Sequence, residues 1–150
     1  MNDDALQQTG IEHTWIFILS LIALICYFRG SFKFFHNQIG YLHWLGLGVL
    51  ADIFMAFAAS TKILPVLVPG EGIPYSSILF ILHITMSTIG MVGYIVIFLL
   101  ILIRGVKKEY TYLKIVVYRI LLPIWIMGVS VALINFLTKV IFDTNLFNTL

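Results

Sequence analysis

Asp52 and His83 are ionisable residues that lie within long apolar stretches of the sequence. A bare carboxylate in the middle of a bilayer is costly, so Asp52 should either carry a proton or meet a partner inside a helix bundle. A carboxylate in that position suits a proton relay or a group that holds a ligand. The structural alternative is a neutral side chain that is hydrogen-bonded to a backbone or hydroxyl group.

Polar and small side chains recur at helical spacing in a stripe formed by His83, Ser87, Gly90, Met91 and Tyr94. We expect this face to point into the bundle, where Ser87 and Gly90 would let another helix approach closely. At a rise of about 1.5 Å per residue, His83 and Asp52 fall roughly one helical turn apart in depth. The carboxylate can then orient the imidazole, as carboxylates do behind metal-ligating histidines. The alternative is a core histidine that is satisfied by hydrogen bonds.

Two further histidines are candidate ligands for a metal or a haem. His13 is expected near the outer surface, on the same side as His83, so a haem held between the two is an open alternative. No second pair of histidines is placed to pass electrons on from such a haem. His36 is expected near the inner surface, and His43 lies on the opposite face of its helix from Asp52.

The composition indicates which solvent surrounds these residues. The 150-residue chain is 61% apolar and 11% charged, with a mean hydropathy of +1.03, whereas soluble domains are about half apolar and a quarter charged. A soluble fold of this length cannot bury so much apolar surface, which excludes a water-soluble enzyme, a disordered tail and a free nucleic-acid-binding domain. The sequence has no hydrolase, phosphate-loop, zinc-protease or dinucleotide motif, so we expect no enzymatic activity.

Four apolar segments are long enough to cross a bilayer as helices, which takes about 20 residues each. They cover residues 10–28, 41–64, 78–103 and 115–142. Backbone groups in lipid must be satisfied within their own segment, so the spans should be helical. We therefore predict an all-α, four-transmembrane-helix bundle that forms one domain over residues 1–150. Pro123 is expected in the first turns of the fourth helix, where its missing N–H is tolerated.

The basic residues set the orientation of this bundle. Seven of the nine belong to the first and third connections or lie beside them: Arg29, Lys33, Arg104, Lys107, Lys108, Lys114 and Arg119. The positive-inside rule then places both termini on the non-cytoplasmic side of a prokaryotic cytoplasmic membrane. The acidic start of the chain argues against a cleaved signal peptide.

Aromatic side chains are expected to mark the membrane interfaces. Phe32, Lys33, Phe34 and Phe35 form a short aromatic and basic run, which is typical of an interfacial anchor. The tryptophans, Trp125 among them, are interpreted as belt and packing residues rather than as a cofactor box.

The second half of the chain resembles a four-helix membrane family known as "domain of unknown function 420". The similarity lies in residues 82–90 (LHITMSTIG), in the basic loop that follows, in residues 122–125 (LPIW) and in Gly128; Arg29, Gly30 and His36 match more weakly. Lys114 stands where the family has a further histidine. The matching positions are His36, His83, Ser87, Gly90, Pro123 and Trp125, of which only the histidines can ligate a metal.

Some members of that family are maturation factors of haem-copper cytochrome oxidases. The resemblance thus implies an accessory or assembly protein of a respiratory-type membrane oxidoreductase, which contacts lipid and other membrane subunits. The small-residue faces would hold partner helices, and the chain would transiently present His83, with Asp52 behind it, to copper or haem. The alternatives are a haem-b electron-transfer subunit and a purely structural accessory subunit, so the cofactor stays open between haem, copper and none.

Overall fold

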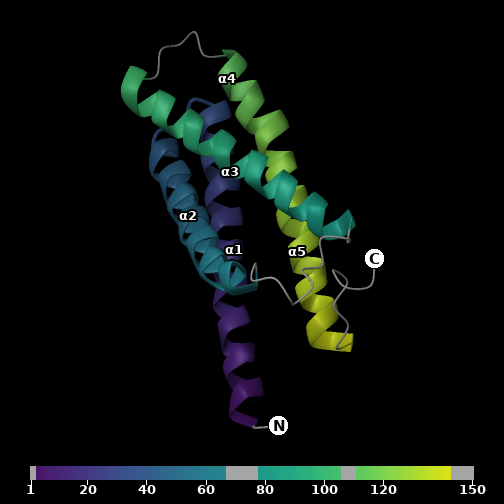
Figure 1. Ribbon diagram of the computed structural model, residues 1–150. Helices are drawn as coiled ribbons and strands as arrows, with labels where there is room; N and C mark the ends of the chain where they lie inside the picture. Colours follow the sequence, from purple (N-terminus) through teal and green to yellow (C-terminus); the bar gives the residue numbers. More distant parts are fainter. Residues whose placement is uncertain (1–2, 67–77, 106–110, 143–150) are drawn as a thin grey trace.

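The computed structural model describes the backbone of residues 3–66, 78–105 and 111–142, and the side chains within 17–57, 78–105, 111–138 and 141–142. Every regular element in these ranges is a helix, which confirms the predicted all-α class. Figure 1 shows their arrangement. The elements are α1 (Asp3–Phe35), α2 (Tyr41–Val66), α3 (Ile78–Arg104), α4 (Thr111–Ile115), the π-helix η1 (Val116–Leu121) and α5 (Leu122–Phe142).

The first helix is longer than predicted, and the connection after it is shorter. α1 is followed by a left-handed residue, Asn37 (φ 58°), whose N–H donates to Phe34 O, while the N–H of Gln38 donates to Lys33 O. This pair of bonds is a Schellman motif, which closes a helix with the residue best able, after glycine, to adopt positive φ. Arg29 and Lys33 were predicted to lie in the connection, but they lie within the helix.

α4, η1 and α5 form one continuous helix, so the position predicted for Pro123 was wrong. Pro123 lies well inside this helix instead of in its first turns. It has no N–H for the carbonyl of Arg119 and would crowd that carbonyl in a regular α-helix. The π-helical turn lies directly before it, and the N–H of Leu122 donates to Val117 O, five residues back. The wider turn accommodates the proline without ending the helix.

The helices pack mainly as two pairs, α1 with α2 and α3 with α5 (Figure 1). Glycines bring each pair together. A Cβ at Gly48 would lie 2.7 Å from the ring of Tyr27, and a Cβ at Gly90 would lie 2.8 Å from the Cβ of Trp125. A Cβ at Gly128 would lie 2.7 Å from the backbone nitrogen of Ser87. The small-residue face of α3, predicted to hold partner helices, is thus occupied by α5 of the same chain.

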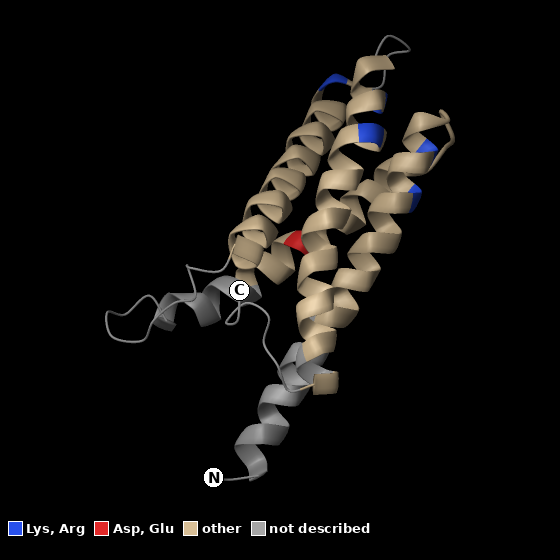
Figure 2. Cartoon of the chain, turned by 90° about the vertical axis from the view of Figure 1, so that its right-hand side faces the viewer, with Lys and Arg blue, Asp and Glu red and all other residues tan. Residues whose placement is uncertain are grey.

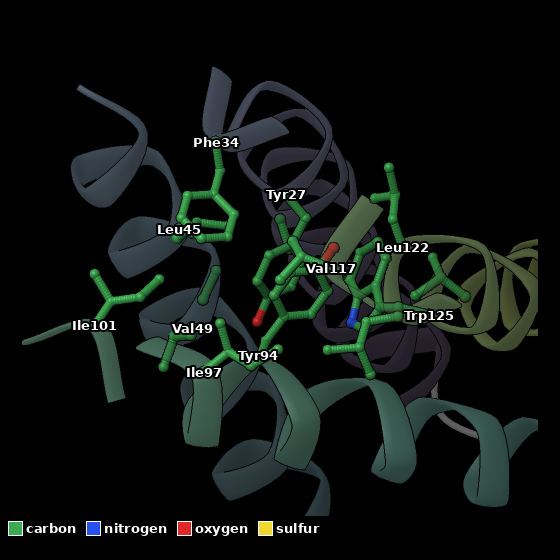
Figure 3. Close-up of a cluster of buried hydrophobic side chains, with 14 residues drawn as sticks. Tyr27, Phe34, Leu45, Val49, Tyr94, Ile97, Ile101, Val117, Leu122 and Trp125 are labelled. Carbon is green, nitrogen blue, oxygen red and sulfur yellow. The ribbon is translucent and has the colours of Figure 1, made fainter. Parts of the chain in front are cut away.

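Three aromatic rings occupy the centre of the core (Figure 3). Tyr27 stacks on Tyr94 with a centroid distance of 3.9 Å and an interplanar angle of 17°, and Trp125 meets Tyr27 edge-on at 4.9 Å. All three side chains are at most 1% exposed. Because they come from α1, α3 and α5, this cluster joins both helix pairs.

The predicted interfacial anchor does not face one direction. Phe34 is 1% exposed and belongs to the core, where its ring lies 5.0 Å from that of Tyr41. Phe32 remains exposed, and Phe35 stacks on Tyr118 at 4.9 Å. The prediction was wrong for Phe34 because the helix continues through this run, so that successive side chains point about 100° apart.

Large apolar side chains cover the outside of all the long helices, in an amount unusual for a soluble monomer. Phe57, Ile103 and Ile141, on three different helices, are each more than 60% exposed. Within the described residues, three helices are long and apolar enough to cross a membrane: Phe17–Phe35, Ile78–Arg104 and Thr111–Thr138. A shorter apolar helix, Tyr41–Phe57, belongs to α2. These surfaces are compatible with contact to a lipid bilayer.

Candidate functional site

Asp52 lies on α2 in the interior of the bundle and is 5% exposed. Its Oδ2 accepts a hydrogen bond from the Tyr27 hydroxyl and another from Trp125 Nε1, both at 2.8 Å. These contacts connect α1, α2 and α5 through one carboxylate oxygen. Asp52 is the sole acidic residue among those whose side chains the structure describes.

Two glycines leave the space in which Tyr27 and Trp125, the hydrogen-bond donors to Asp52, are packed. Gly48 lies one turn before Asp52 on α2, and its missing side chain leaves the space that the Tyr27 ring occupies. Gly90 does the same for Trp125 from α3. The Tyr27 ring also stacks on Tyr94, whose hydroxyl lies 2.8 Å from Ser31 Oγ. Among the described residues, no buried side-chain oxygen or nitrogen lacks a hydrogen-bond partner.

His83 on α3 is oriented by the backbone of α5. Its Nδ1 lies 2.8 Å from the carbonyl oxygen of Gly128 and 3.2 Å from Ser87 Oγ. A carbonyl oxygen can only accept, so Nδ1 carries the hydrogen and Nε2 is the acceptor nitrogen of the ring. This tautomer is the one that a metal-ligating histidine adopts when its other nitrogen is held by a backbone carbonyl.

Asp52 and His83 line the same cavity, which has a volume of about 280 Å³. The two residues therefore share one cavity, but the predicted contact between the carboxylate and the imidazole is replaced by separate hydrogen bonds to other residues. The carboxylate oxygen Oδ2 is held by Tyr27 and Trp125, while the imidazole is oriented by Gly128 and Ser87.

The rest of the cavity wall is mostly apolar and contains two thioethers. Met55 comes from α2 and Met91 from the His83 stripe on α3. The sulfur of Met55 accepts a hydrogen bond of 3.3 Å from Ser20 on α1. The cavity thus offers a carboxylate oxygen, an imidazole and two soft sulfur atoms within an apolar surround.

The other predicted ligands do not join this site in the described part of the chain. His36 directly follows α1, and its Nδ1 lies 2.9 Å from Phe32 O. His83 lies near the start of α3, whereas the basic Arg104 lies at the end of the same helix. The side chain of His13 lies outside the described residues. No group of three or more His, Cys, Asp or Glu side chains in the described ranges could hold a metal ion.

Two residues of the site were missed by the sequence interpretation. Tyr27 was not singled out, and Trp125 was assigned to packing, yet both donate to Asp52. The sequence did contain one indication of such a partner. Gly48 lies one turn before Asp52, and a glycine on this face leaves room for a large side chain from another helix. Lys114, where the family resemblance expects a histidine, is buried and donates to Asn37 Oδ1, so it links α4 to the end of α1.

No family model, curated protein or solved structure matches this chain. The resemblance to the "domain of unknown function 420" family therefore stays a prediction that rests on the residues quoted for it.

Proposed function

We propose that the chain is an integral protein of a prokaryotic cytoplasmic membrane that crosses the bilayer four times, with both termini on the non-cytoplasmic side. The apolar outer surface supports the membrane placement. The basic residues that the structure describes lie toward one end of the bundle (Figure 2); they are Arg29, Lys33, Arg104, Lys114 and Arg119. The positive-inside rule assigns that end to the cytoplasm.

In this membrane the protein acts as an accessory or assembly protein of a respiratory-type oxidoreductase, and a haem-copper oxidase is the partner that the family resemblance favours. Its task is to hold a copper ion transiently in the cavity that Asp52 and His83 line. The observation that carries this proposal is the His83 ring, which is oriented by the Gly128 carbonyl and lines a cavity together with two thioethers. Imidazole and thioether are ligands that suit copper(I).

Each residue of the cavity has a separate part in this proposal. His83 supplies the nitrogen ligand, and Met55 and Met91 supply soft sulfur. Asp52 places a carboxylate beside the same space, which compensates the positive charge of the ion in a medium of low dielectric. In this proposal the copper ion is cargo that the chain holds, and the chain carries out no reaction on it.

Copper(I) binding provides the direct test of His83. We expect His83→Ala in the detergent-purified protein to weaken copper(I) binding at least about tenfold, since even the outer-shell partners of metal ligands change affinity by about 10–100-fold. The measurement is competition with a chromogenic copper(I) chelator. His43→Ala is the matched control because His43 is exposed and does not line the cavity. Equal affinity in all three proteins contradicts the copper site, and a stable Soret band that is lost in His83→Ala supports the haem-b alternative.

Deletion of the gene tests the assembly role. We expect the membranes of the deletion strain to lose copper-dependent oxidase activity and the absorption of the mature oxidase. Expression of wild-type protein or of the His43→Ala variant should restore both, whereas the His83→Ala variant should not. Terminal oxidases that remain spectrally and catalytically normal in the deletion strain would show that the protein has another task.

A further inference from the structure

A second cavity, of about 510 Å³, lies at the basic end of the bundle. Its polar wall consists of Arg29, Lys33, Gln38, Trp44 and Tyr118, and phenylalanines complete it. We propose that this cavity binds the headgroup phosphate of an anionic phospholipid. The proposal shares the membrane placement argued above but is independent of copper and of His83.

Two cations of this cavity lie on one face of α1. Arg29 and Lys33 are four residues apart, a spacing at which like charges repel each other. Asp52, the sole acid among the described side chains, is buried and accepts its hydrogen bonds from Tyr27 and Trp125, so it does not compensate them. An anion bound in the cavity would be attracted to both cations and would offset their mutual repulsion.

The cations are held in place by their neighbours. The guanidinium carbon of Arg29 lies 5.2 Å from the ring centroid of Trp44, which orients the side chain toward α2. The ammonium group of Lys33 donates to Ile39 O at 3.3 Å. A guanidinium can bind a phosphate through two parallel hydrogen bonds, and an ammonium group adds a point charge.

The aromatic walls favour a lipid over free phosphate. Trp44 and Tyr118 are residue types that concentrate at the headgroup level of a bilayer, because each has an apolar ring and a polar group. Phe28 and Phe32 are both exposed at the cavity and offer contact to the glycerol and the first methylene groups of a lipid. Basic pockets between transmembrane helices on the cytoplasmic side are a known type of site for such headgroups.

Native mass spectrometry of the detergent-purified full chain tests this site, with phosphatidylglycerol and phosphatidylcholine as probes. We expect preferential retention of phosphatidylglycerol, and a loss on the order of tenfold in the Arg29→Gln/Lys33→Gln variant. The matched control is Arg104→Gln/Arg119→Gln, which removes the same charge at the same end but outside the cavity, and it should retain the lipid as the wild type does. Lys33→Gln alone, checked by near-ultraviolet circular dichroism, provides a milder variant with an intermediate loss.

Three outcomes would overturn the proposal. Equal retention of the two lipids would show that the headgroup charge is not recognised. An equal loss in both double variants would assign the effect to the general charge of that end. Inorganic phosphate that binds as tightly as phosphatidylglycerol would show that the aromatic walls select no lipid. None of these outcomes affects copper(I) binding by His83, so a failure of this site is distinguishable from a failure of the proposed function.

Discussion

Asp52→Ala is expected to destabilise the folded bundle by about 2–4 kcal/mol, since leaving one buried donor unpaired costs about 1–3 kcal/mol and hydrogen bonds between membrane helices contribute about 0.6–1.7 kcal/mol each. The variant leaves the Tyr27 hydroxyl and Trp125 Nε1 without their acceptor in the core. The measurement is the unfolding free energy in mixed micelles of dodecyl maltoside and sodium dodecyl sulfate, followed by near-ultraviolet circular dichroism.

Asp52→Asn is the matched variant because its amide oxygen can accept both bonds. We expect it to lose less than about half of the stability that the alanine variant loses, because the Tyr27 hydroxyl and Trp125 Nε1 keep an acceptor. Removal of the carboxylate should make insertion of α2 easier in both variants, since a charge at the bilayer centre is unfavourable. The expectation fails if the alanine variant unfolds at the wild-type detergent fraction.

Gly128→Ala is expected to separate α3 from α5 and to destabilise the bundle by about 1–2 kcal/mol, because overpacking costs about 1–3 kcal/mol and the higher helix propensity of alanine returns at most about 1 kcal/mol. The new Cβ would lie 2.7 Å from the backbone nitrogen of Ser87, which cannot turn away. The same shift moves the Gly128 carbonyl away from His83 Nδ1. Copper(I) affinity should therefore fall together with stability.

Gly93→Ala is the control, in the same pair of helices. Its Cβ would lie 2.4 Å from Leu121 Cδ2, at the far end of a flexible side chain that can change rotamer. We expect an unfolding free energy close to that of the wild type and unchanged copper(I) binding. Equal losses in the two variants would mean that the backbone contact at Gly128 is not what limits the approach of the helices.

The order and type of the helices could be predicted from the sequence. Long apolar segments leave no alternative to helix once lipid is the solvent, so α3 was placed within a residue of its bounds. The stripe that contains His83 and Met91 was predictable for the same reason, because helical periodicity fixes which residues share a face. Asp52 stood out through its type alone.

The partners of these residues were decided by the tertiary structure. Periodicity places a side chain on a face but carries no information on which residue of another helix lies opposite. The pairing of Asp52 with Tyr27 and Trp125 depends on how deeply the rings enter beside Gly48 and Gly90, which is a matter of packing between helices.

Local sequence patterns also failed at Phe34 and at Pro123. The aromatic and basic run around Phe34 predicted an interfacial position, but packing between helices buries its ring. Pro123 predicted the first turns of a helix, but the π-helical turn before it lets the helix continue. The sequence by itself determined the helices and the residues on each face, and its composition predicted lipid as the solvent. Only the tertiary structure decided the pairs, because contacts between helices depend on the shapes of both surfaces and not on the spacing within one chain segment.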